Sequence, residues 1–230
     1  PLTTGRCHPL TILDDHSRFV LCLAACADER EATVRQQLIT TFERYGLPRC
    51  IQTDNGSPWG HDTEHPFTRL TVWLLRYGVQ VGHSAPYHPQ TQGKDERFHR
   101  TFKAELLQGR QWRDLEECAS AFPAYRDGYN TERPHEALGL ATPASRYTPS
   151  PWRFTPEPPP VEYGPEDTVR KVNDGGDISW QGRLYTIGKA FVHCPVALRP
   201  TITDGVWEVY FCRQQVRTLD LRNPASDSQV

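Results

Sequence analysis

The sequence predicts a mixed α/β domain that is followed by a small all-β domain. Short apolar runs alternate with helical patterns of apolar residues over residues 1–147, which is typical of a sheet flanked by helices. Eight prolines then fall between Pro143 and Pro165, and such a stretch behaves as a semi-rigid extended spacer. Beyond it, polar and apolar residues alternate up to residue 221, as in half-buried strands.

The first part of the α/β domain is expected to contain two strands and a helix. Residues 8–14 and 18–27 are apolar runs with β-branched members, joined by three polar residues. They predict adjacent strands with a tight connection. Residues 29–45 repeat apolar side chains at four-residue steps and end at Gly46, which predicts a helix.

The second part supplies two further strands and three helices. Residues 49–53 and 79–83 predict short strands, with a helix over residues 67–77 between them. Helices are also expected over residues 94–107 and 114–129, and Pro123 is expected to interrupt the latter.

These patterns also predict the domain boundaries. We expect an α/β core over residues 1–147, a proline-rich linker over residues 148–165 and a small β-barrel over residues 166–225. About five short strands fit into the last region, with hairpin turns at Gln181-Gly182 and Asp204-Gly205.

The bulk composition of the 230 residues is that of a soluble protein. No apolar run approaches the ~20 residues of a membrane helix, and no signal peptide is recognisable. We therefore expect no membrane partner and a cytoplasmic location. The seven cysteines lack metal-binding spacing, which fits free thiols in a reducing compartment. The chain contains no methionine, which indicates a fragment or a processed protein.

Charge is distributed unevenly along the chain. The net charge of −2 lacks the basic surplus that is usual in nucleic-acid-binding proteins. Between Lys94 and Arg113, however, there are six Lys and Arg residues and only three Asp and Glu residues. Positive charge is therefore concentrated around one predicted helix.

Two carboxylates are placed as metal ligands of an enzyme acting on nucleic acid. Asp54 follows a predicted strand, where α/β sheets usually place ligands, and Glu96 lies in the first turn of a predicted helix. Mg²⁺ and Mn²⁺ prefer oxygen ligands, and two such ions about 3.5–4 Å apart can hold the attacking and leaving oxygens of a phosphodiester. We expect both carboxylates to bind metal, with water or a DNA 3′-hydroxyl as the nucleophile.

Polar and basic residues around Glu96 are candidates for DNA contacts. The helical step places Arg100 and Lys103 within about 40° of Glu96, and the loop before the helix offers imidazole and amide donors. The candidate DNA-binding residues are His88, Gln90, Gln92, Lys94, Arg97, Arg100 and Lys103.

Each of these features also has a simpler interpretation. An Asp-Asn-Gly sequence after a strand is usually only a turn, and an acidic residue in the first turn of a helix usually stabilises the helix dipole. Basic residues on an exposed helical face are mostly solvated, and a single loop histidine is seldom a ligand. The combination of the features, rather than any one of them, favours the enzyme.

Four segments in this order resemble a known family. They are LDDHSR (residues 13–18), TDNGS (53–57), YHPQTQGKDER (87–97) and YNTERPHEAL (129–138). The chain resembles the DDE-type integrase-core transposases of the IS481/IS3-like group of insertion sequences, which are related to retroviral integrases. The resemblance implies an α/β fold with an RNase H-like mixed sheet flanked by helices, followed by a small all-β SH3-like barrel.

The resemblance identifies Asp54 and Glu96 as the second and third acidic residues of the family's catalytic triad. They are separated by 41 residues, more than is usual in the family, which fits an insertion at residues 59–66. The first acidic residue would lie before Pro1, so we expect the chain as given to be catalytically impaired. Asp14 and Asp15 match a second-strand motif, and we expect Asp15 to cap the turn or pair with the arginine at position 18, with metal binding as the alternative.

The resemblance implies a polynucleotidyl transferase that uses Mg²⁺ or Mn²⁺ in a two-metal mechanism. It would hydrolyse DNA at transposon ends and join the 3′-hydroxyls to target DNA. Its partners would be DNA and further copies of the chain, in a dimer or tetramer associated with the nucleoid. The alternative is a truncated or domesticated relative that binds DNA or supports assembly without catalysis. A third interpretation is an RNase H-like nuclease without transposition.

Overall fold

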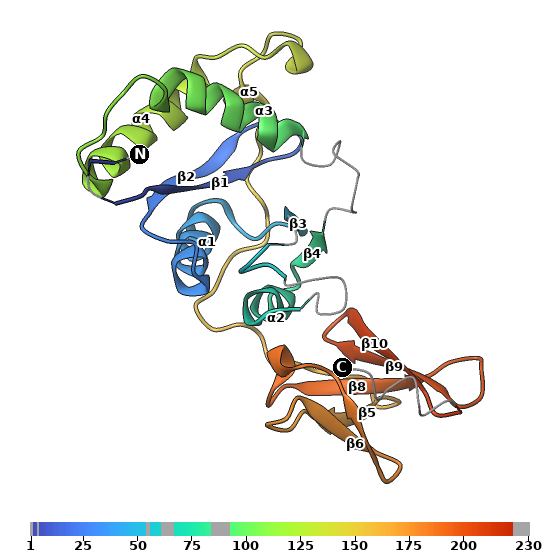
Figure 1. Cartoon of the computed structure of the whole chain (residues 1–230). Helices are drawn as coiled ribbons and strands as arrows, with labels where there is room; N and C mark the ends of the chain where they lie inside the picture. The colour runs from blue at the N-terminus through green and yellow to red at the C-terminus, as the bar shows by residue number, and fades with distance from the viewer. Residues whose placement is uncertain (1, 4, 54–55, 61–66, 84–92, 223–230) are drawn as a thin grey trace. The chain divides into compact units, whose positions relative to one another are not determined.

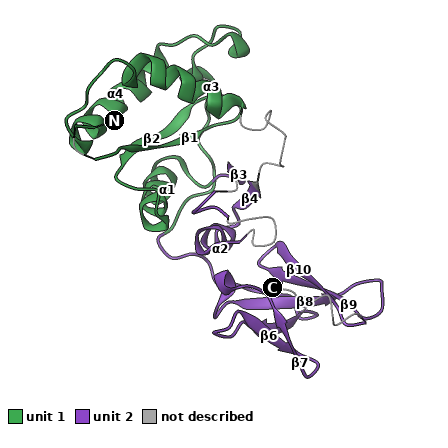
Figure 2. Ribbon diagram, in the orientation of Figure 1, with its two compact units in different colours: residues 1–47, 84–155 green, residues 48–83, 156–230 purple. Residues whose placement is uncertain are grey.

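The computed structural model of the chain describes residues 2–3, 5–53, 56–60, 67–83 and 93–222 (Figure 1). Contacts divide the chain into two compact units, each built from segments that are distant in sequence. Unit 1 comprises residues 1–47 and 84–155, and unit 2 comprises residues 48–83 and 156–230 (Figure 2). Each unit has a hydrophobic core of its own.

A two-stranded antiparallel ladder forms the sheet of unit 1. β1 (His8–Leu13) pairs with β2 (Val20–Cys26), and a bulge near the end of β1 adds one residue to β2. The extra residue changes the alternation of side chains. Val20 and Leu23 therefore contribute to the same core although three positions separate them.

Helices lie on both sides of this ladder in Figure 1. α3 (Gly93–Phe102) and α4 (Leu115–Thr131) lie on one side, and α1 (Glu31–Tyr45) lies on the other. α3 and α4 share a hydrophobic core with β2. The buried residues of this core are Val20, Leu23, Phe98, Phe102, Trp112, Cys118, Phe122 and Tyr129.

Two local predictions for unit 1 were wrong, and a third holds in extent only. The helical run expected over residues 94–107 does end at Leu107, but its last turn is π-helical, η2 (Lys103–Leu107). Pro123 does not interrupt α4. Proline has no backbone N–H and costs the helix one hydrogen bond, but the burial of the neighbouring Phe122 outweighs this loss. The proline-rich stretch opens with a short helix, α5 (Pro143–Arg146), whose first position tolerates proline.

Unit 2 begins with a small parallel pair of strands. β3 (Cys50–Thr53) pairs with β4 (Gln80–His83), and α2 (Arg69–Arg76) connects them in sequence. Thr68 caps α2, since its hydroxyl accepts from the backbone N–H of Thr71 at 3.3 Å.

The rest of unit 2 is an antiparallel sheet with a separate hairpin. The sheet has the order β10-β9-β8-β5, and β6 pairs with β7. Gln181 and Gly182 both have positive φ, at 47° and 77°, which is the hairpin-turn geometry expected there. The elements are β5 (Thr168–Lys171), β6 (Asp177–Trp180), β7 (Arg183–Thr186), η4 (Lys189–Phe191), β8 (Pro195–Pro200), β9 (Val206–Phe211) and β10 (Gln214–Asp220).

The core of unit 2 joins α2 to this sheet. Val72 and Leu75 of α2 belong to the same buried cluster as Phe191, and the rings of Phe67 and Phe191 are 5.2 Å apart. The mixed α/β class is confirmed, while the boundaries 1–147, 148–165 and 166–225 stay predictions. None of the helices in the described ranges has the length and apolar composition needed to cross a bilayer.

Candidate functional site

Two buried phenylalanines fix the orientation of α3. Phe98 and Phe102 are each only 1% exposed. The Phe98 ring meets Tyr129 edge-on at 5.0 Å between centroids, and Phe102 meets Phe122 at 5.1 Å. Since residues three or four apart share a helical face, this packing decides where the polar side chains of α3 point.

Asp95 points toward β1. The Thr11 hydroxyl donates to Asp95 Oδ1 at 3.3 Å, and His99 Nε2 lies 3.3 Å from Asp95 Oδ2. Thr11 Oγ1 and His99 Nε2 are themselves 2.9 Å apart. This carboxylate is therefore engaged in holding α3 against the ladder.

Glu96 occupies an exposed face of α3, about 100° around the helix from Asp95. Its side chain has no hydrogen-bond or ion-pair partner among the residues that the structure describes. Arg100 and Lys103 are also exposed and follow Glu96 at the four- and seven-residue spacing of one helical face. Of the two acidic residues in the first turn, Glu96 is therefore the one available to a ligand.

Four of the predicted site residues, Asp54, His88, Gln90 and Gln92, lie outside the described residues. β3 ends at Thr53, the residue before Asp54 in the sequence. The proximity of Asp54 to Glu96 stays a prediction. Within the described ranges, no group of three or more His, Cys, Asp or Glu side chains is arranged to hold a metal ion.

The turn between β1 and β2 uses both of its aspartates. Asp14 Oδ2 accepts from the backbone N–H of Ser17 at 2.7 Å and from its hydroxyl at 2.6 Å. Asp15 Oδ1 lies 2.5 Å from Lys94 Nζ, and the Arg18 guanidinium donates to the Asp15 carbonyl oxygen. The cap is thus Asp14 instead of Asp15, whose carboxylate contacts Lys94.

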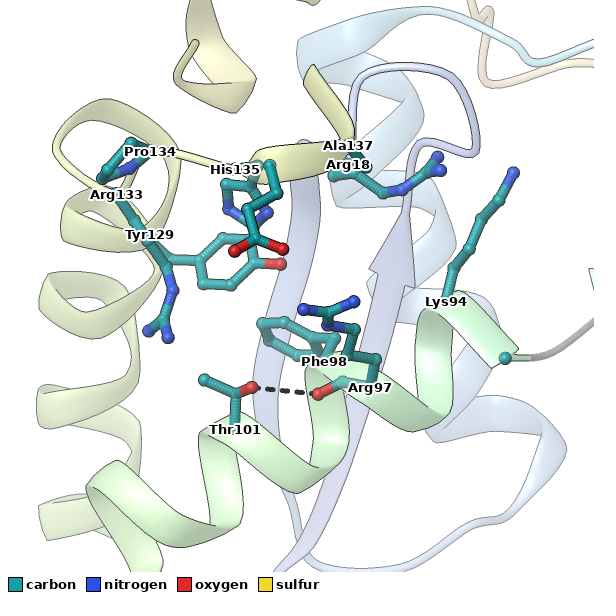
Figure 3. Close-up of a pocket in the computed structure, with 12 residues that line it drawn as sticks. Arg18, Lys94, Arg97, Phe98, Thr101, Tyr129, Arg133, Pro134, His135 and Ala137 are labelled. Carbon is teal, nitrogen blue, oxygen red and sulfur yellow. Dashed lines mark hydrogen bonds between the residues drawn. The ribbon is translucent and has the colours of Figure 1, made fainter. Parts of the chain in front are cut away.

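A pocket of about 400 Å³ lies between this turn, α3 and the segment after α4, all within unit 1 (Figure 3). Four cationic side chains line it: Arg18 from the turn, Lys94 and Arg97 from α3, and Arg133 from beyond α4. Glu136 is the carboxylate in this lining. The predicted basic residues of α3 are therefore divided between two faces.

Glu105 holds Arg133 in the wall of the pocket. Both Glu105 carboxylate oxygens accept from Arg133 Nη1 at 2.7 Å, and the Tyr125 hydroxyl donates to Glu105 Oε2 at 3.0 Å. The hydrogen bond that Arg133 donates to Glu105 raises the pKa of Arg133. Burial, followed by the hydrogen bond with Glu105, raises the pKa of Tyr125.

Tyr129 and His135 contribute aromatic surface to the pocket. Their rings are 4.9 Å apart, and the buried Nε2 of His135 has no hydrogen-bond partner in the described part of the chain. Burial lowers the pKa of His135 and the surrounding guanidinium groups lower it further, so the imidazole is neutral at pH 7. Burial raises the pKa of Tyr129, which keeps its hydroxyl protonated as a hydrogen-bond donor.

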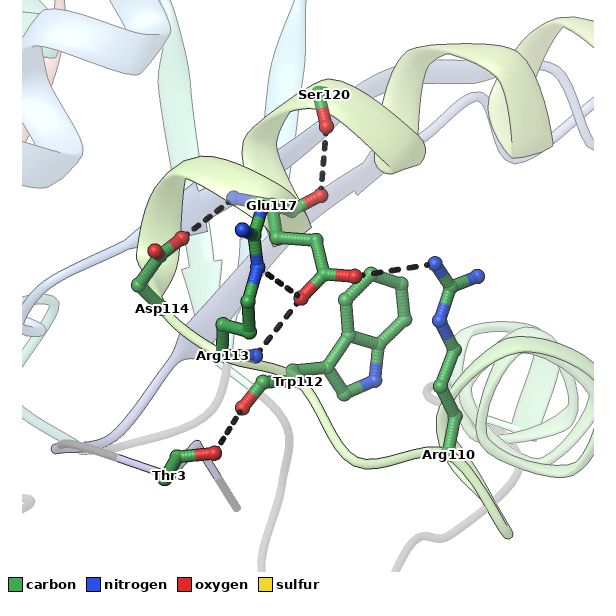
Figure 4. A network of polar contacts seen from close by, with 7 residues as sticks. All are labelled: Thr3, Arg110, Trp112, Arg113, Asp114, Glu117 and Ser120. Atoms are coloured by element: carbon green, nitrogen blue, oxygen red, sulfur yellow. Dashed lines mark hydrogen bonds and ion pairs between the residues drawn. The ribbon is translucent and has the colours of Figure 1, made fainter.

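Two basic residues of the charged stretch are engaged elsewhere (Figure 4). Glu117 accepts from the backbone N–H of Arg113 at 2.8 Å and lies 3.4 Å from Arg110 Nη2. The hydrogen bond from the Arg113 backbone lowers the pKa of Glu117. Asp114 caps α4 by accepting from the Glu117 N–H at 2.9 Å. Arg110 and Arg113 thus stabilise the start of α4, and the local charge surplus is smaller than the sequence suggests.

Sequence reasoning missed the part of the pocket that lies outside α3. Arg18, Tyr129, Arg133 and His135 all lie in segments that carry the family resemblance, but they received no binding role. The basic residues within these two segments were the available signal. Convergence of these segments cannot be read from spacing, because it depends on tertiary packing.

Three family models match consecutive parts of the chain. Integrase core domain models match residues 1–89 and residues 77–143. The C-terminal domain of IS481 family transposases matches residues 167–227. The matches follow the order that the sequence segments predict.

Retroviral polyproteins are among the similar curated proteins. The Pro-Pol polyprotein of Simian foamy virus type 3 (strain LK3) is 32% identical over 122 residues, and that of Simian foamy virus type 1 is 30% identical over 120 residues. Each match covers 50% of this chain but 10% of the polyprotein. A solved chain of a simian T-cell lymphotropic virus intasome in complex with PP2A regulatory subunit B56 gamma is also similar. It has a TM-score of 0.46 and 15% identity, and the match covers 95% of this chain and 74% of that one.

The two integrase-core matches join without a gap and together span residues 1–143. They include Glu96 on its exposed face and the segments that form the basic pocket. The chain therefore belongs to the integrase superfamily, with an integrase core followed by a domain that matches the C-terminal domain of IS481 family transposases.

Proposed function

We propose that this chain is the catalytic region of a DDE-type transposase. It hydrolyses DNA phosphodiesters at the ends of a mobile element and transfers the freed 3′-hydroxyls to target DNA. The observation that carries the proposal is Glu96, an exposed carboxylate without a partner among the described residues, at the start of a helix anchored by Phe98 and Phe102. The integrase-core matches support the same reading.

The donor chemistry suits Mg²⁺ or Mn²⁺. Hard cations of this kind take carboxylate oxygens, and Glu96 offers one on a rigid element, with Asp54 proposed as the second ligand after β3. Two bound ions would stabilise the attacking and leaving oxygens during displacement at phosphorus. Asp95 is a poorer candidate, because Thr11 and His99 already engage it.

The remaining residues of this face would position the DNA strand. Arg100 and Lys103 lie on the Glu96 face and can bind phosphate oxygens on either side of the reacting bond. Water serves as the nucleophile in the hydrolysis step, and the 3′-hydroxyl serves in the transfer step. His88, Gln90 and Gln92 of the preceding loop would add neutral hydrogen-bond donors to the same strand.

We also infer the arrangement of the whole protein on DNA. The region 166–225 would be an SH3-like module, joined to the core 1–147 by the linker 148–165. The family match over residues 167–227 and the antiparallel order β10-β9-β8-β5 support this inference. Joining two element ends to one target requires two active sites in one assembly, which supports a dimer or tetramer in the nucleoid.

A strand-transfer assay with labelled element-end DNA and Mg²⁺ or Mn²⁺ tests the function. The assay uses protein that includes the region before Pro1, where the resemblance expects the remaining carboxylate. Glu96→Gln and Asp54→Asn should reduce joined product to background. Asp95→Asn is the matched control on the same helical turn and should retain product.

Two outcomes would contradict the proposal. Full activity of Glu96→Gln would show that the site is wrongly assigned. Wild-type protein that binds element ends but neither nicks nor joins them would favour the DNA-binding or assembly module instead.

A further inference from the structure

We propose that the pocket between the β1–β2 turn, α3 and the segment after α4 binds one backbone phosphate of DNA, on a different face of α3 from Glu96. The inference rests on the proposed action on DNA and deepens it. It assigns binding roles to Arg18, Arg133 and His135, and it assigns Arg97 to this pocket instead of the Glu96 face.

Three segments bring positive charge to one small space. Arg18, Arg97 and Arg133 come from positions that are far apart in the sequence, yet all three line a cavity of about 400 Å³ (Figure 3). Like charges gathered in this way repel each other. An arrangement of this kind is favourable when an anion occupies the space between them.

Only part of this charge is neutralised by the protein itself. Asp15 lies 2.5 Å from Lys94, and Glu105 lies 2.7 Å from Arg133. Within the described ranges, Arg18 and Arg97 have no carboxylate at ion-pair distance.

Glu136 also lines the pocket, so one negative charge opposes the two guanidinium groups that form no ion pair with a described residue. A net positive charge remains for a ligand. Substitution of Glu136 should therefore act in the opposite direction to substitution of Arg97.

Neutral donors complete the site. The protonated hydroxyl of Tyr129 and the unpaired Nε2 of His135 belong to side chains of the lining. Burial lowers the pKa of His135, and the charges of Arg133, Arg97 and Arg18 lower it further.

The backbone at Arg18 is held in an unfavourable conformation. Its φ of 63° lies in the left-handed region, which residues other than glycine seldom adopt. Asp14 maintains this conformation, because its carbonyl oxygen accepts from the Arg18 N–H at 2.9 Å. An arginine at a position that favours glycine fits a binding role for the side chain.

The chemistry of the lining favours a phosphate over other anions. Guanidinium groups bind phosphate through paired hydrogen bonds, and several of them around one space can bind different oxygens of one tetrahedral group. The volume suits a phosphate with its adjoining sugar and is too small for a base pair in a groove. Free phosphate shares this chemistry, so the test has to separate the two sources.

The first test measures duplex DNA binding by fluorescence anisotropy in EDTA over a series of salt concentrations. Arg97→Ala and Arg18→Ala should each weaken binding about tenfold and reduce the slope of log affinity against log salt by about 0.9 for the phosphate contact that is lost. Glu136→Gln should strengthen binding. Arg44→Ala removes the same charge from an exposed position on α1 and should leave binding unchanged.

Arg18→Gly guards against a folding artefact, because glycine tolerates the left-handed turn and still lacks the guanidinium. Titration calorimetry with inorganic phosphate tests whether free phosphate, instead of a DNA phosphate, is the ligand of the pocket. Phosphate binding that is lost in Arg18→Gly, together with unchanged DNA affinity, would overturn a DNA phosphate as the ligand. Unchanged DNA affinity and salt slope in both arginine variants would overturn the pocket altogether.

Failure of the pocket can be told apart from failure of the proposed function. Glu96→Gln should not weaken DNA binding, whereas strand transfer should disappear. If the wild-type protein transfers strands and the Arg18 and Arg97 variants keep wild-type DNA affinity, the pocket alone is refuted. A protein whose arginine variants lose DNA affinity, but which never transfers strands, supports the pocket and refutes the transposase activity.

Discussion

The buried side chain of Asn130 pairs with both backbone polar groups of Val20, which lies 110 residues earlier in the chain. Asn130 Oδ1 accepts from the Val20 N–H at 2.8 Å, and Asn130 Nδ2 donates to the Val20 carbonyl at 3.0 Å. Asn130 is 2% exposed and Val20 is fully buried. The amide thus acts as a strand partner where the bulge begins, and it ties the end of α4 to β2.

Replacement of Asn130 by Ala should destabilise unit 1 strongly. Both backbone groups of Val20 would stay buried without partners, and an unsatisfied buried group costs about 1–3 kcal/mol. We expect a loss of about 3 kcal/mol in the free energy of unfolding, measured by urea denaturation followed by circular dichroism. Thr131→Ala is the adjacent control and should change the free energy by less than about 0.5 kcal/mol, because Thr131 is exposed.

Substitutions of Arg18 should separate turn stability from binding. The residue has a φ of 63°, and a side chain in this region costs about 1–2 kcal/mol relative to glycine. We therefore expect the Arg18→Gly protein to be about 1 kcal/mol more stable than the Arg18→Ala protein, while both bind DNA equally weakly. Thermal unfolding of the two variants measures the difference, and equal stability would mean that the turn relaxes in solution.

Periodicity and turn chemistry predicted most elements of the fold. The helix that ends at Gly46 and the hairpin at Gln181-Gly182 lie where the sequence places them, because apolar spacing and glycine position are local properties. Pro123 shows the limit of local reasoning, since tertiary burial of its neighbours maintains α4 through it.

Packing partners were beyond the reach of the sequence. Val72 and Leu75 show a helical pattern, but the pattern does not say that they join the core of the C-terminal sheet in unit 2. The same holds for the candidate site. Glu96 could be selected because a motif and a helix start coincide there, whereas the meeting of Arg18 with Arg133 depends on how the turn and α4 pack around α3.

The contact between Glu105 and Arg133 should matter less for stability than that of Asn130. The side chains are 44% and 38% exposed, and water therefore screens their attraction. Glu105→Gln should lower the free energy of unfolding by less than about 1 kcal/mol, measured by urea denaturation. Glu43→Gln, at an exposed position on α1, is the control and should have no effect. A loss as large as that of Asn130→Ala would show that the pair is better shielded than its exposure indicates.

Stability should depend on pH through His135. Burial and the charges of Arg133, Arg97 and Arg18 lower the pKa of its imidazole from 6.5 in the folded protein. The unfolded chain therefore binds this proton at a higher pH than the folded chain does. The contribution of His135 to the free energy of unfolding is therefore fully present above about pH 6.5. It is lost as the pH falls through the lowered pKa.

Urea denaturation of wild type and His135→Gln at about pH 7.5 and about pH 5.5 measures this contribution, with other titrating groups cancelling in the comparison. The charged groups that act on the imidazole come from the turn (Arg18), from α3 (Arg97) and from the segment after α4 (Arg133). We expect wild type to lose more stability than the variant on acidification, and equal losses would contradict the prediction. Saturating phosphate should reduce the difference, because an anion in the pocket would raise the pKa of the neighbouring imidazole toward its value in the unfolded chain.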